Sequence, residues 1–198
     1  MTALKTETIP RGGREFLVSL YPDDDVDPPW ETEEGHGQVE YQGSSRCPIP
    51  RGWTVLYNDP RGPGRWVYNF GAALVQASRE GWGLSPDQLA RLGPKPSRGK
   101  IRAETVRTDM AHLRGYIVGD WCYIGVCVQI IGPDGRPEGT PFDYALWGVE
   151  SEGDYWREVA DELADEILHH RREKWRKTLS EARARKYWES RDIITIGA

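Results

Sequence analysis

The run at residues 122–131 constrains the fold of this chain more than any other stretch. Its sequence, CYIGVCVQII, is rich in β-branched and aromatic residues, and both alternating sets of positions are largely apolar. Successive side chains of a strand point to opposite faces, so this pattern predicts a strand buried on both sides, in the centre of a sheet. Gly132-Pro133-Asp134-Gly135 supplies turn chemistry, and residues 142–149 return as a second strand. A helix is expected to open near Ser151.

The remaining periodicities extend this pair into an α+β fold. We expect an antiparallel sheet with helices packed mainly on one face and a long C-terminal helix. The predicted strands are 14–21, 53–57, 66–69, 121–131 and 142–149, and the predicted helices are 70–80, 102–118 and 153–169.

The predicted organisation is one α+β domain with two appendages. Residues 1–13 form a flexible lead-in, residues 14–169 form the domain, and residues 170–198 form a basic helical extension and tail. A helix from 153 to 190 would be about 55 Å long at ~1.5 Å per residue, which exceeds a small domain. Residues 171–190 therefore either project from the domain or fold back after a break near His169-His170.

Composition points to a polar cytoplasmic protein. The chain has 198 residues, a net charge of −5, and nine Trp and nine Tyr against three Phe. Amphipathic aromatic side chains must then supply much of the buried area. The three cysteines, Cys47, Cys122 and Cys127, do not form a disulfide pattern and fit a reducing cytoplasm. No apolar run is long enough for a membrane span, and the N-terminus lacks a signal-peptide core.

Acidic side chains gather in two stretches, residues 22–34 and 150–166. The first contains prolines and no base, so it predicts a solvated loop, or an anionic surface for a basic partner. The second lies at the start of the predicted C-terminal helix, where acids suit the helix dipole. The acidic partner-binding candidates are Asp23, Asp24, Asp25, Asp27, Glu31, Glu33, Glu34, Asp154, Glu158, Asp161, Glu162 and Asp165.

From residue 171 the sign of the charge reverses, and aromatic residues are interleaved with cations. This pattern is typical of single-stranded nucleic-acid binding through phosphate contacts and stacking. Alternatively, the thin apolar stripe of this helix packs on its own domain or on a second copy, giving a homodimer. The candidates for nucleic-acid binding or self-association are Arg171, Arg172, Lys174, Trp175, Arg176, Lys177, Arg183, Arg185, Lys186 and Trp188.

Catalytic and metal-binding signals are sparse. Asp109 with His112, and Glu166 with His169, place a carboxylate and a histidine three residues apart on helices, a spacing found in di-metal bundles. Such sites need glutamates from two more helices, so surface charge pairs beside an apolar stripe are the preferred interpretation, and we expect no metal. No nucleophile elbow, phosphate-binding loop or Cys-x-x-Cys pair occurs. We expect no cofactor, and an enzyme, such as a metal-dependent hydrolase, is the least supported class.

Several short motifs are distributed along the chain, namely Pro29-Trp30-Glu31, Gly35-His36-Gly37, Glu80-Gly81-Trp82-Gly83, residues 121–128, Leu146-Trp147-Gly148-Val149-Glu150-Ser151, Gly153-Asp154-Tyr155 and residues 158–167. Together they resemble a family of uncharacterised proteins encoded by tailed bacteriophages and prophages. The resemblance covers about residues 14–168, and the basic extension 171–198 departs from it. The family has no assigned activity or catalytic residues, so the resemblance implies only an accessory viral protein inside a bacterial cell.

The leading functional hypothesis from the sequence is therefore a non-enzymatic phage accessory protein. It would bind, and inhibit or redirect, a host defence or nucleic-acid-processing protein through its acidic surfaces. The alternative is a nucleic-acid-binding accessory protein that uses the basic C-terminal helix.

Overall fold

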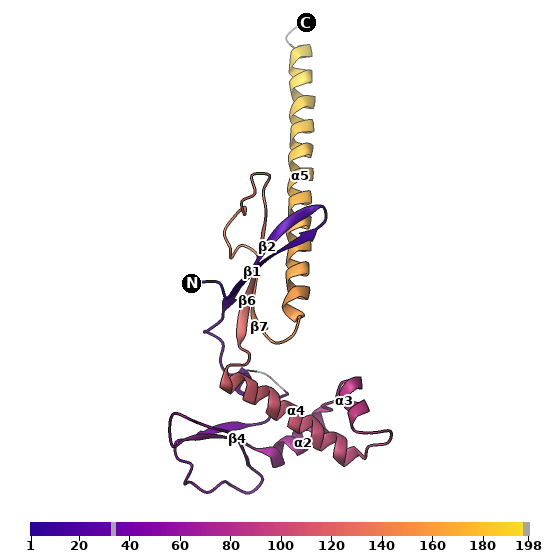
Figure 1. The fold of residues 1–198 in the computed structure, drawn as a ribbon. Coiled ribbons are helices and arrows are strands. Elements are labelled where there is room, and N and C mark those ends of the chain that lie inside the picture. The colour runs from indigo at the N-terminus through magenta and orange to yellow at the C-terminus, as the bar shows by residue number, and fades with distance from the viewer. Residues whose placement is uncertain (33–34, 196–198) are drawn as a thin grey trace. The chain divides into compact units, whose positions relative to one another are not determined.

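The chain folds into two compact units (Figure 1). The computed structural model describes residues 1–32 and 35–195, with the side chains of Thr32 and of residues 188–195 outside the description. Unit 1 combines residues 1–24 with the described residues from 123 onward, and unit 2 comprises residues 25–122. Unit 2 is thus inserted in the sequence between two strands of unit 1.

Unit 1 is built on a four-stranded antiparallel sheet of order β1-β2-β6-β7. Its strands are β1 (Lys5–Arg11), β2 (Arg14–Pro22), β6 (Tyr123–Ile130) and β7 (Ala145–Glu150). β6 lies between β2 and β7 and is buried along its whole length, as its two-sided apolar sequence predicts. β1 and β2 are joined by Gly12 and Gly13, which both have positive φ, as a two-residue type I′ turn requires.

The long helix α5 (Tyr155–Thr195) covers one face of this sheet with its first half. Alternate residues of β2 and β6, including Phe16, Val18, Val126 and Val128, are fully buried against it. The helix contributes Trp156, Val159, Ala160, Ala164 and Ile167, which recur at helical spacing. From there α5 continues without a break past the end of the sheet, so the extension projects and does not fold back (Figure 1).

Unit 2 has a three-stranded antiparallel sheet of order β3-β5-β4 and four helices. Its elements are α1 (Pro29–Thr32), β3 (Val39–Gln42), β4 (Thr54–Asn58), β5 (Arg65–Tyr68), α2 (Phe70–Glu80), α3 (Pro86–Arg91) and α4 (Arg98–Val118). Tyr68, Val106 and Leu113 are fully buried in its core. Local signals set the helix starts: Ser85 forms a capping box with Gln88, and the Ser97 side chain accepts from the Lys100 N–H.

The structure confirms the α+β class, the antiparallel pairing and the long C-terminal helix. It corrects the single predicted sheet, because the predicted strands 53–57 and 66–69 belong to a separate sheet with β3. Both edges of β6 are occupied by β2 and β7, which leaves no edge there for that hairpin. The predicted single domain over 14–169 is divided between the two units. The expected lead-in 1–13 contains β1, paired along its full length with β2.

Candidate functional site: a basic groove at the root of the projecting helix

One face of α5 changes chemical character where the sheet ends. Up to Ile167 this face is apolar and buried on the sheet. Over the following turns the same face carries Arg171, Lys174, Trp175 and Thr178, which all line a groove. The sheet has no strand left to cover them, because β6 ends at Ile130 and β2 begins at Arg14.

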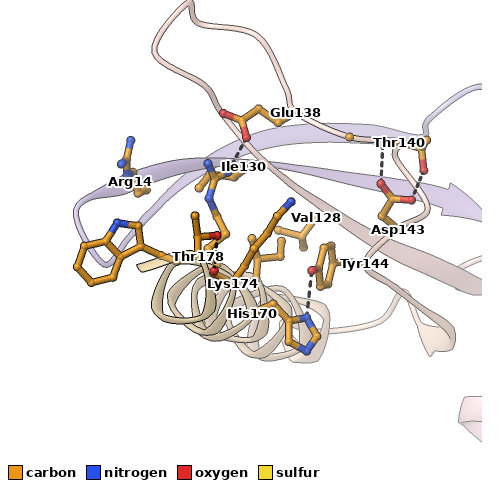
Figure 2. A pocket seen from close by; sticks show the side chains of 14 residues that line it. Arg14, Val128, Ile130, Glu138, Thr140, Asp143, Tyr144, His170, Lys174 and Thr178 are labelled. Carbon is orange, nitrogen blue, oxygen red and sulfur yellow. Dashed lines mark hydrogen bonds and ion pairs between the residues drawn. The ribbon is translucent and has the colours of Figure 1, made fainter. Parts of the chain in front are cut away.

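The groove has a volume of about 650 Å³ and lies between α5 and the segment that links β6 to β7 (Figure 2). Its apolar lining comes from Val128 and Ile130 of β6 and from Ile167 of α5. Its polar lining comes from three parts of unit 1, namely Arg14 at the start of β2, Glu138, Gly139, Thr140, Asp143 and Tyr144 of the linking segment, and His170, Arg171, Lys174, Trp175 and Thr178 of α5.

Hydrogen bonds give the linking segment a defined shape. The Glu138 N–H donates to the Ile130 carbonyl over 2.9 Å, and the Gln129 side-chain amide donates to the Gly139 carbonyl over 3.1 Å. The Asp143 carboxylate accepts from the backbone N–H and the hydroxyl of Thr140, at 2.8 and 2.7 Å. These bonds lower the pKa of Asp143, so its negative charge is kept near neutral pH.

The charges in the groove are unevenly distributed. Arg171 is paired with Glu138 at 2.5 Å, whereas Arg14 and Lys174 form no ion pair with any residue that the structure describes. The Tyr144 hydroxyl lies 3.0 Å from His170 Nδ1. Arg14 and Asp143 lie at opposite ends of the groove in Figure 2, so one end is cationic and the other carries the carboxylate.

A second, smaller cavity adjoins the groove at its cationic end, beside Arg14. Its volume is about 270 Å³, and it shares Arg14, Ile130, Arg171 and Trp175 with the main groove. Gly12, Leu168 and Arg172 complete its lining. The Trp175 side chain therefore borders two hollows that both lie among arginine side chains, and 65% of its surface is exposed.

Beyond the groove, α5 carries an excess of positive charge into solvent. Residues 171–187 hold eight lysine or arginine side chains and two glutamates. All of them are exposed, and among the cations only Arg171 has an ion-pair partner in the described part of the chain. The predicted basic residues thus form one continuous exposed surface. Of that set, the Trp188 side chain lies outside the described residues.

The predicted acidic surface is partly used for internal contacts. Arg11 binds Asp165 at 2.6 and 3.0 Å and Asp161 at 3.4 Å, and its guanidinium lowers the pKa of Asp165. Asp154 pairs with Arg157, and Asp23 accepts the Gly148 N–H over 2.8 Å. The other acidic candidates, Asp24, Asp25, Asp27, Glu31, Glu158 and Glu162, are exposed. Glu33 and Glu34 lie outside the described residues.

Asp109, a metal candidate for which the sequence favours a surface charge pair, is instead the buried acceptor of a hydrogen-bond network in unit 2. Its side chain is 7% exposed and contacts His36 Nδ1 at 2.6 Å, the Gly37 N–H at 2.9 Å and the Tyr68 hydroxyl at 2.6 Å. A carboxylate only accepts, so His36 carries its proton on Nδ1. Burial, together with the Asp109 charge, raises the pKa of Tyr68 far above its usual value.

The other metal candidates do not join Asp109 in a site. His112 stacks on His36 at 5.6 Å and on Trp121 at 4.3 Å between ring centroids. Glu166 and His169 belong to unit 1, where Glu166 lies 4.0 Å from His170, and His169 lies 3.3 Å from Glu173. Within the described ranges, no group of three or more His, Cys, Asp or Glu side chains is arranged to hold a metal ion.

The sequence predicts the cations and the tryptophan that α5 contributes to the groove, but not the residues that the sheet and the linking segment contribute. Arg171, Lys174 and Trp175 were identified by the charge reversal and the interleaved aromatics. Arg14, Tyr144 and Glu138 were missed, because their place beside α5 follows from sheet order, which the sequence does not encode locally. His170 was noted only as a possible break in the helix.

No protein-family model matches the chain, and no curated protein or solved structure is significantly similar to it. In the part of the chain that the structure describes, no helix combines the length and the hydrophobicity that a bilayer span requires.

Proposed function

We propose that this protein is a non-enzymatic nucleic-acid-binding protein that uses the second half of α5 and the groove at its root. The observation that supports this proposal is the exposed run of cations on residues 171–187, together with Arg14 and Lys174 at the groove, which form no ion pair with a described residue. Phosphate groups are the partners that such a surface attracts over many contacts, releasing bound counterions. An exposed tryptophan among these cations adds a stacking surface for bases.

The overall charge of −5 does not oppose this proposal, because the two signs are separated along α5. Two acids of the first half, Asp161 and Asp165, are bound by Arg11, whereas the cations of residues 172–187 are exposed and form no ion pair in the described part of the chain. Local potential, and not net charge, governs the approach of a polyanion within a Debye length of about 8–10 Å.

The test is fluorescence anisotropy with a 3′-fluorescein-labelled 20-nucleotide single strand at several salt concentrations. The variant R176A/K177A/R183A should weaken binding and flatten the salt dependence by about 2 units of slope, at ~0.7 per lost phosphate contact. The control R91A/K95A/R98A removes the same charge from three exposed positions in unit 2 and should leave binding nearly unchanged. Absence of binding by the wild type at 50 mM salt would refute the proposal.

A second candidate function is the inhibition or redirection of a host protein by a phage accessory protein in the bacterial cytoplasm. The observation that favours it is the exposed acidic segment of unit 2, where Asp25, Asp27 and Glu31 form no ion pair with a described residue. Such a surface would steer a basic partner in a salt-sensitive way. The variant D25N/D27N/E31Q should lose a host protein that the wild type retains. The control D87N/D120N/E181Q, which removes the same charge from exposed acids outside the candidate set, should retain it. Equal retention by all three proteins would exclude this role for the segment.

A further inference from the structure

The position of Trp175 is not explained by the fold of unit 1. Its indole is 65% exposed on α5, and it is not part of the core that joins α5 to the sheet. A large aromatic side chain in water forgoes the hydrophobic stabilisation that burial would supply. It borders both hollows at the root of the projecting segment, where a flat apolar ligand could cover it.

The side chains around Trp175 suit a phosphate group. Arg14 lines both hollows with Trp175, Lys174 lines the larger and Arg172 lines the smaller. These three cations form no ion pair with any described residue, so each can contact an anion without first breaking a pair. Arg171 is different, because it is already bound to Glu138.

The size of the groove restricts what can enter it. A volume of about 650 Å³ falls within the range of small-ligand sites, roughly 300–1,000 Å³. That space accommodates a nucleotide and is too small to enclose a paired double strand. In addition, the bases of a duplex are stacked on both faces, so an aromatic side chain can stack only on a base that is unpaired.

We infer that this groove is a nucleotide subsite that makes the protein prefer single strands over duplexes. One unpaired base stacks on Trp175, and its phosphate lies among Arg14, Lys174 and Arg172. The carboxylate of Asp143, at the other end of the groove, repels the backbone and keeps the phosphate at the Arg14 end. This inference rests on the proposed function, since the cations of residues 176–187 would attract both forms of nucleic acid through their phosphates and would not by themselves favour the single strand.

The test compares two probes, a fluorescein-labelled dT15 and a 15-base-pair duplex, with the full-length protein. The wild type should bind dT15 at least tenfold more tightly than the duplex. W175A should lose about tenfold in affinity for dT15, the effect expected for one stacking contact, with the duplex affinity unchanged. W175F should retain most of the preference, because phenylalanine still offers a ring face.

The charge variants separate the groove from the rest of the helix. R14A and K174A should weaken dT15 binding more than duplex binding. K177A, which removes the same charge from a residue of α5 outside the groove lining, should weaken both probes by the same factor. Trp175 is exposed, so these variants should fold normally, which circular dichroism would verify.

The outcomes distinguish this inference from the proposed function. If the wild type binds both probes equally, or if W175A weakens both probes by the same factor as K177A is expected to do, the groove is not a nucleotide subsite, although the helix still binds nucleic acid. If neither probe binds at 50 mM salt, both the proposed function and the subsite are refuted.

Discussion

Replacing Asp109 by alanine should destabilise unit 2 by about 3–5 kcal/mol, the usual cost of removing one partner from a buried charged network. The carboxylate accepts from His36, Gly37 and Tyr68 at 2.6–2.9 Å, and its side chain is 7% exposed. Tyr68 has no exposed surface, so its hydroxyl cannot recover a bond to water in the variant. His36 is 15% exposed in its side chain and can partly rehydrate, which places the total below the sum of three separate bonds.

Two milder variants should remove smaller parts of the stability that this network contributes. D109N keeps the shape and one acceptor oxygen, and Y68F removes a single donor, so each should cost about 1–2 kcal/mol. The double variant D109N/Y68F should cost less than the sum of the two, because both changes affect the same contact.

The measurement is thermal unfolding, combined with amide hydrogen exchange read separately in α4 and α5. For a unit of this size, a loss of 3–5 kcal/mol lowers Tm by about 15–30 °C. Exchange should accelerate in α4 and stay unchanged in α5, which belongs to unit 1 and serves as the internal control. A D109A protein whose α4 exchanges at the wild-type rate would refute the reasoning.

Three further predictions concern other residues. Gly125→Ala would place a Cβ 2.4 Å from the Trp147 ring, so urea unfolding should show that unit 1 loses about 1–3 kcal/mol of stability. Gly99→Ala, in open space on α4 of unit 2, should leave the stability of unit 2 unchanged or raise it slightly. Because Arg11 lowers the pKa of Asp165, the stabilisation from this ion pair is present above the ordinary aspartate pKa and is lost as the pH falls through the lowered value. R11A should raise the Asp165 pKa toward its ordinary value in an NMR titration. The pKa of Tyr68 is raised by folding, so the stability of unit 2 should hold up to the ordinary tyrosine pKa of about 10 and fall at higher pH. Y68F should lessen this fall in alkaline unfolding curves.

Features decided by neighbouring residues could be predicted from the sequence, and features decided by distant ones could not. The two-sided apolarity of residues 122–131 predicts a central strand, and β6 is one. The Ser85 and Ser97 caps fix the starts of α3 and α4 in the same local way. The second partner of β2, however, is β6, about a hundred residues later, and no local rule selects that strand over the nearer β4.

Hydrophobic periodicity does not predict β1. Its sequence, KTETIPR, is polar and contains a proline, because β1 is an edge strand with much of its surface in solvent. The decisive signal is Gly12-Gly13, which forms the two-residue turn into β2. A glycine pair at the end of a loop predicts a flexible lead-in. The same pair in a type I′ turn predicts a strand on each side of it, which is what the structure has.

The charge reversal at residue 171 was visible in the sequence, but its consequence depends on where the sheet stops. Before that point the helix buries an apolar face on the sheet, and Arg11 binds Asp161 and Asp165 of the helix. After it, the stripe of Trp175, Leu179 and Ala182 is too thin for a stable helix pair, and two parallel copies would bring their cations together. We therefore expect a monomer by light scattering at low salt, with association appearing only when a polyanion screens the charge; a dimer at 20 mM salt without added polyanion would instead assign the projecting half of α5 to self-association.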